Sequence, residues 1–173
     1  MTYNLHPIIV HFPIALLTLY SAIKVLPVRR LLPRIAWRDA ERVLLLFGVL
    51  GAFAALATGN TAERFLRPSR EILDAHSTFA HIATLLYVLL LVGELTAMAN
   101  ARFALSWSAY PRVKKIFLML ETILCHTIFS GILATIAFLA LAITGLLGGV
   151  MVYGTSADPL AGLVLKVLGI TSF

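Results

Sequence analysis

Long apolar runs alternate with short polar connections along this chain. The runs cover about residues 7–25, 42–59, 76–100 and 117–153. A helix of about 20 residues crosses a hydrocarbon core of about 30 Å, so each run is long enough to span a membrane. The pattern predicts an all-α integral membrane protein, with four transmembrane helices packed as an up-down bundle in a single domain of residues 1–173.

The fourth run is longer than one crossing requires. We expect it to tilt, to bend near Ser130-Gly131, or to begin as an interfacial turn. The tail of residues 158–171 is apolar but too short to cross, and Lys166 interrupts it. This tail is predicted to lie along the membrane interface.

Composition supports the bilayer as the solvent of this chain. Hydrophobic residues make up 60% and charged residues 13%, whereas soluble domains average about 45–50% and 25%. Cys125 is the single cysteine, which excludes an intrachain disulfide and a paired-cysteine metal site. The net charge of +6 is explained by membrane topology, so we expect no binding of nucleic acid.

Cations are distributed unevenly among the connections. Residues 24–42 carry six and residues 101–115 carry four, whereas residues 60–75 carry three and the tail carries one. Because cytoplasmic loops are enriched in Lys and Arg, the first and third connections are predicted to be cytoplasmic and both termini to lie outside. Trp37, Trp107 and Tyr110 lie beside these connections as expected interfacial anchors.

Four of the five histidines form two pairs with the same spacing. His6 and His11 begin the first helix, and His76 and His81 begin the third. At 1.5 Å per residue, His11 and His81 should lie about 7.5 Å deeper than their partners. Ionisable residues within a membrane usually face the bundle interior and carry function.

Heme b between the first and third helices would explain these pairs. The two helices are diagonal in a four-helix bundle, with axes roughly 11–14 Å apart. We expect His11 and His81 to ligate the heme iron, and His6 and His76 to bind heme propionates or water. Gly145 and Gly149 form a GxxxG face that would admit a flat ligand, although plain helix packing also explains it.

Three further observations bear on the ends of the helices. Thr58-Gly59 and Thr144-Gly145 form a weak internal echo, and Asp74 could cap the third helix. Near the opposite end, Glu94, Glu121 and His126 could form a proton path or a quinone site. They are explained more simply as interfacial residues whose polar ends reach the cytoplasmic surface.

Several strings together resemble one family. They are HPIIVHFPIAL from His6, Thr58-Gly59, the histidines of the third helix, and TGLLGGVMVYG from Thr144. They resemble the bacterial membrane family catalogued as domain of unknown function 2231, from His6 to about Gly154. The tail after Tyr153 departs from the pattern.

The resemblance implies a four-helix relative of b-type cytochromes in the bacterial inner (cytoplasmic) membrane. It implies electron transfer, with a quinone and a respiratory redox protein as partners. Carried onto this chain, the family pattern selects the four histidines chosen by spacing and a set of small residues: Gly59, Gly145, Gly148 and Gly149.

Three functions remain open from the sequence. The first is an electron-transfer subunit that binds heme b. The second is a membrane protein that binds Cu or Zn through the four imidazoles at the outer leaflet. The third is an assembly or scaffold subunit without a cofactor, as an oligomer or within a larger complex. All three describe an accessory membrane subunit rather than a stand-alone enzyme, because no nucleophile, base and carboxylate share one depth.

Overall fold

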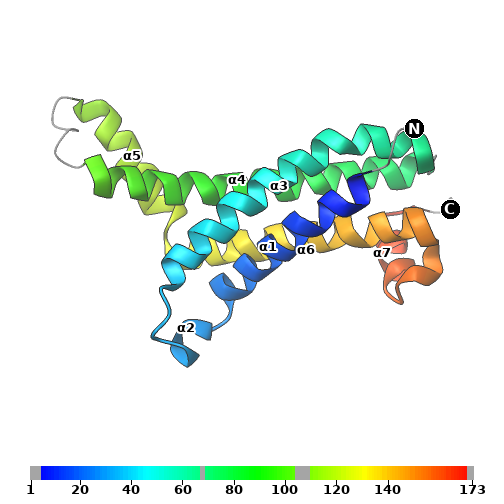
Figure 1. Ribbon diagram of the computed structural model, residues 1–173, viewed down its shortest axis with the longest axis horizontal. Helices are drawn as coiled ribbons and strands as arrows, with labels where there is room; N and C mark the ends of the chain where they lie inside the picture. Colours follow the sequence, from blue (N-terminus) through cyan, green and yellow to red (C-terminus); the bar gives the residue numbers. More distant parts are fainter. Residues whose placement is uncertain (1–4, 67–68, 104–109, 171–173) are drawn as a thin grey trace.

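A computed structural model describes residues 5–66, 69–103 and 110–170. Four long apolar helices form a bundle, as the sequence predicts, and each has a segment long and apolar enough to span a membrane. The long helices are α1 (His6–Val25), α3 (Trp37–Leu66), α4 (Arg70–Phe103) and α6 (Thr127–Tyr153). The shorter elements are α2 (Val28–Leu31), α5 (Pro111–Leu124), the 3-10 turn η2 (Thr155–Ala157) and α7 (Ala161–Val167) (Figure 1).

Two helix pairs make up the bundle. α1 packs along α3, and α4 packs along α6, while contacts between α1 and α6 and between α3 and α4 join the pairs. α1 and α4 therefore occupy diagonal positions, as expected. α1 begins and α7 ends at the same end of the molecule (Figure 1). We call it the histidine end, because His6, His11, His76 and His81 lie there.

Aromatic side chains close the centre of the bundle. The rings of Tyr20 on α1 and Tyr87 on α4 meet edge to face, with centroids 6.2 Å apart and planes at 74°. The Tyr87 hydroxyl also lies 2.8 Å from Ser21 Oγ, and Leu17 and Leu45 are fully buried beside it. These side chains therefore occupy the diagonal between α1 and α4, between the histidine end and the opposite end.

The fourth apolar run is divided into two helices. α5 ends at Leu124 and α6 begins at Thr127, so the helix is interrupted at Cys125-His126 rather than near Ser130-Gly131. His126 has an extended backbone, with φ −59° and ψ 126°. Gly93 on α4 allows Leu124 to come close at this point. No proline or glycine marks the break, which explains why the sequence pattern does not reveal it.

α3 and α4 extend beyond the expected apolar limits at both ends. Hydropathy marks where a helix leaves hydrocarbon, not where its hydrogen bonding stops. α4 begins before Asp74, and the backbone N–H of Ile72 donates to Ser69 Oγ at 3.4 Å. Trp107, an expected interfacial anchor, lies outside the described residues.

The tail folds back onto the histidine end of the bundle. Ala161 and Leu165 of α7, with Ile170 after it, are buried in one apolar cluster with the ends of α4 and α6. Leu147 and Val150 provide the α6 side of that cluster. α7 therefore covers part of this end instead of standing apart from it.

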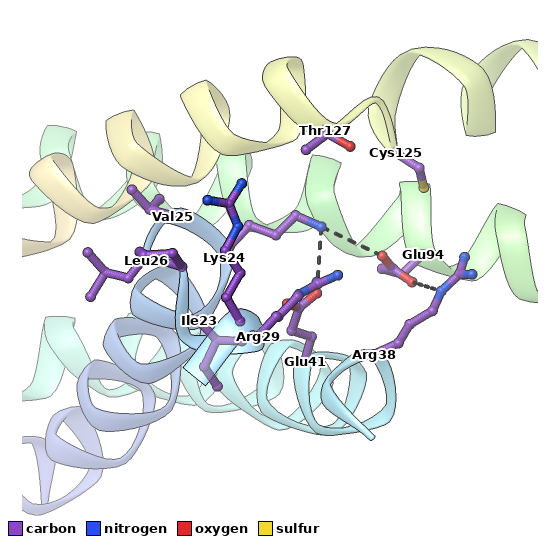
Figure 2. Close-up of a pocket in the computed structure, with 12 residues that line it drawn as sticks. Ile23, Lys24, Val25, Leu26, Arg29, Arg38, Glu41, Glu94, Cys125 and Thr127 are labelled. Atoms are coloured by element: carbon purple, nitrogen blue, oxygen red, sulfur yellow. Dashed lines mark hydrogen bonds and ion pairs between the residues drawn. The ribbon is translucent and has the colours of Figure 1, made fainter. Parts of the chain in front are cut away.

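The other end of the bundle holds a network of ion pairs around two buried carboxylates, which we call the charged cluster. Its members are Lys24, Arg29, Arg38, Glu41, Arg42 and Glu94. Figure 2 shows all of them except Arg42. Glu41 and Glu94 are only 1% and 6% exposed. Lys24 Nζ lies between them, 3.6 Å from Glu41 Oε2 and 4.0 Å from Glu94 Oε1.

Arginines complete the charged cluster. The Arg42 Nε–H donates to Glu94 Oε2 at 3.1 Å, and Arg29 donates to Glu41. A buried carboxylate is tolerated only when it is paired and hydrogen-bonded. The charged cluster therefore links α1, α3 and α4 at a single level.

Substituting Gly93 by Ala should weaken the packing of α5 on α4. A Cβ at this position would lie 2.7 Å from Leu124 Cβ, an atom that cannot move without its backbone. Overpacking of this kind costs about 1–3 kcal/mol. Unfolding in mixed detergent micelles, followed by circular dichroism, should show the loss. Gly131→Ala is the control, since no described atom lies within 4 Å of the added Cβ; equal effects would contradict the contact.

Substituting Glu41 by Gln should destabilise the bundle more than a surface carboxylate does. Removing one member of a buried ion pair costs roughly 3 kcal/mol or more, because the other charge is left uncompensated. Here Lys24 keeps Glu94 as a partner, so we expect the lower part of that range. Glu63→Gln, at an exposed position of the same helix, is the matched control. A Glu41→Gln protein as stable as that control would argue against the charged cluster.

Candidate functional site

His6 and His76 each tie one helix pair together at the histidine end. His6 Nδ1 lies 3.0 Å from Thr58 Oγ1, whose hydroxyl donates to the Ala54 and Ala55 carbonyls of its own helix at 3.1 and 3.0 Å. The imidazole is therefore the donor in the contact between α1 and α3. His76 Nδ1 donates to the Thr144 carbonyl at 2.9 Å, which joins α4 to α6 in the same way.

These hydrogen bonds define the tautomer of both rings. A carbonyl only accepts, and the Thr58 hydrogen is already committed, so Nδ1 carries the proton in each imidazole. The lone pair is then on Nε2. A histidine held through Nδ1–H in this way is oriented as histidine ligands of metals are oriented.

His11 and His81 occupy different surroundings. Both side chains are exposed, and their Nδ1 atoms contact carbonyls of their own helices, Pro7 O and, at 2.7 Å, Ser77 O. The expected arrangement, in which His11 faces His81 across the bundle, therefore differs from the structure. Five residues of α-helix turn the side-chain direction by about 140°. The two members of each pair consequently cannot both face inward.

Glycines lie beside the inward histidines, though not the pair singled out by spacing. A Cβ on Gly148 would lie 3.3 Å from His76 Cε1, and one on Gly59 would lie 3.9 Å from His6 Cε1. Among the described residues, no atom comes within 4 Å of a Cβ built on Gly145 or Gly149. Gly148 is thus the close-packing position of α6.

The two halves of the bundle have a similar histidine–threonine contact at the same place. In each half, a histidine at the start of the first helix bonds to the threonine of a Thr-Gly pair on the second, to the Thr58 hydroxyl in one half and to the Thr144 carbonyl in the other. The weak echo between Thr58-Gly59 and Thr144-Gly145 in the sequence therefore marks equivalent places in the fold.

The remaining predicted groups do not gather into one site. Within the described ranges, no group of three or more His, Cys, Asp and Glu side chains is placed to hold a metal ion. Glu121 accepts a hydrogen bond from Asn100 Nδ2 at 2.6 Å, Glu94 belongs to the charged cluster, and His126 is exposed. Of the three residues considered for a proton path or quinone site, Glu94 and Glu121 thus have different partners, and the His126 side chain is exposed.

A cavity of about 560 Å³ lies beside the charged cluster (Figure 2). It is bounded by the end of α1, by α2, by the start of α3, by α4 and by the start of α6. The lining residues that carry charge or polarity are Lys24, Arg29, Arg30, Arg38, Glu41, Glu94, Cys125 and Thr127.

Sequence reasoning missed this cavity, although it noted Glu94 and counted the cations. The available signal was that three charged residues, Lys24, Glu41 and Glu94, fall on the same predicted side of the membrane in three successive apolar helices. Cys125 forms one wall. Burial, followed by the nearby Glu94 carboxylate, raises the pKa of the Cys125 thiol, which keeps the thiol protonated at neutral pH.

Comparison with known proteins identifies a family but no characterised relative. No curated protein matches the chain, and no solved structure does. A family described as predicted membrane protein (DUF2231) matches the chain over residues 2–158. Four membrane-spanning helices agree with that description, and the match extends over most of the sequence. The chain therefore belongs to the DUF2231 family of predicted membrane proteins.

Proposed function

We propose that this protein is an electron-transfer subunit similar to b-type cytochromes, which holds heme b at the histidine end between α1 and α4. The ligands in this proposal are His6 and His76. One observation carries it: two half-buried imidazoles from the diagonal helices are each held through Nδ1–H by a neighbouring helix. That arrangement directs the Nε2 lone pair to ligation.

The surroundings of His6 and His76 suit this group. Gly59 and Gly148 keep side chains away from the two rings. The Tyr20–Tyr87 contact closes the bundle below, which confines a ligand to the histidine end and excludes water from the centre. When bound, heme would supply one-electron transfer at a potential set by its axial ligands and its burial.

The two electron-transfer partners in this proposal follow from the orientation that we propose. The excess of cations near the charged cluster favours placing that end in the cytoplasm of a bacterium, with both termini outside. Electrons would then pass between a membrane quinol and a redox protein at the outer face, the partners that the resemblance to b-type cytochromes implies.

A second candidate is a scaffold subunit without a cofactor. It is favoured by the same two hydrogen bonds, because His6 and His76 already hold α1 to α3 and α4 to α6. In this alternative the imidazoles contribute packing and specificity, and nothing needs to bind them.

An absorption spectrum of the purified protein separates these two functions. Protein from heme-replete cells should show a dithionite-reduced α-band typical of heme b with two histidine ligands. His6→Ala and His76→Ala should abolish the band, because each removes a ligand. His11→Ala and His81→Ala should retain it, since both side chains point away from the bundle.

Other results from the same purified protein would contradict the bound heme or the choice of its ligands. A colourless protein without a metal would favour the scaffold. Stoichiometric Cu or Zn by mass spectrometry would favour the metal-binding alternative. Loss of the band only in His11→Ala and His81→Ala would contradict the choice of ligands.

The proposed orientation can be tested by cysteine labelling. In a Cys125→Ser background, Ser156→Cys near the histidine end and Ala36→Cys before α3 both occupy exposed positions. A membrane-impermeant maleimide applied to intact spheroplasts should label the cysteine at 156 at once and that at 36 only after permeabilisation. The reverse pattern would contradict the orientation.

A further inference from the structure

The cavity beside the charged cluster carries more positive than negative charge. Four cations line it, Lys24, Arg29, Arg30 and Arg38, against two carboxylates, Glu41 and Glu94. Pairing neutralises two of the four, which leaves two positive charges. A cavity of about 560 Å³ with this surplus suits an anionic group.

Hydrogen-bond donors remain around the cavity after the carboxylates are paired. Arg29 and Arg38 are 51% and 60% exposed, and each has one nitrogen within ion-pair distance of a carboxylate oxygen. A guanidinium has five N–H donors in a planar fork that matches phosphate geometry. Arg30 forms no ion pair among the described residues, so its whole fork is available.

The start of α6 adds to the positive potential of the cavity. Thr127, its first residue, lines the cavity, and the His126 side chain makes no capping hydrogen bond. The first-turn N–H groups of a helix of 27 residues favour a negative charge beside them. This contribution reinforces the arginines that line the same space.

Apolar residues form the rim of the cavity. Val25 and Leu26, at the end of α1, line it and are 49% and 54% exposed. α1 leaves its membrane-spanning segment at this point. A ligand here therefore meets cations and hydrocarbon side by side, as the phosphate and the first acyl carbons of a lipid require.

We infer that this cavity binds the headgroup phosphate of an anionic phospholipid. The lipid phosphate contacts Arg29, Arg30 and Arg38, and its acyl chains leave along Val25 and Leu26. The inference is independent of heme at the histidine end, because the Tyr20–Tyr87 contact lies between the two sites.

Lipid titration followed by native mass spectrometry tests the site. The purified, delipidated full chain in detergent is titrated with phosphatidylglycerol, with phosphatidylcholine, or with inorganic phosphate alone. We expect phosphatidylglycerol to bind most tightly and to raise the melting temperature. Arg38→Gln and Arg30→Gln should each weaken its binding by about tenfold, which corresponds to the loss of one charge-assisted hydrogen bond.

Two features of the design keep the outcome decisive. Arg30→Gln leaves every carboxylate of the charged cluster paired, so its effect does not depend on refolding of the cluster. Arg34→Gln removes an exposed cation from the same connection outside the cavity lining, and it should bind as the unaltered chain does. Equal affinity for the two lipids, or equal losses in Arg34→Gln and Arg38→Gln, would overturn the inference. Stabilisation by inorganic phosphate that matches that of the lipid would assign the site to a soluble phosphate ligand instead.

Discussion

Two carboxylates are buried where α1, α3 and α4 come together, and their neutralisation constrains the rest of the bundle. Glu41 and Glu94 lie on neighbouring helices and would repel each other without a cation between them. Lys24 from α1 takes that place. An unpaired charge in a low-dielectric interior is far less favourable than a misplaced apolar side chain. The charged cluster therefore holds α1 at one register against α3 and α4.

This register reaches the opposite end of the molecule. His6 precedes Lys24 by 18 residues on one continuous helix, which is about 27 Å along its axis. Once Lys24 is in place, the depth of His6 is determined, and Thr58 on α3 meets it there. The hydrogen bonds of the histidine end can form because the ion pairs of the other end set the depth of the helices.

The sequence predicted the spans and the diagonal placement of α1 and α4, since both follow from run length and the order of helices. It did not predict the break at Cys125-His126, where neither proline nor glycine occurs. The histidines were located at the correct end, but the inward pair is His6 and His76. The rotation of an α-helix over five residues shows that the two histidines of a pair face different directions, whereas their depths alone do not. The cavity is lined by residues from separate helices, and the hydropathy pattern along the chain does not show which residues of different helices meet.

The repeated contact between histidine and a Thr-Gly pair has a consequence for the symmetry of the chain. α1 and α4 both start at the histidine end, and α3 and α6 both end there, so the two halves run in parallel. Transporters with inverted repeats instead have an axis in the membrane plane, and exchanging the states of their halves exchanges the two sides. Here the paired histidines lie at one end of the bundle and the charged cluster lies at the other. Each half therefore contributes an imidazole to one end of the bundle and charged side chains to the other, which makes the two ends chemically distinct.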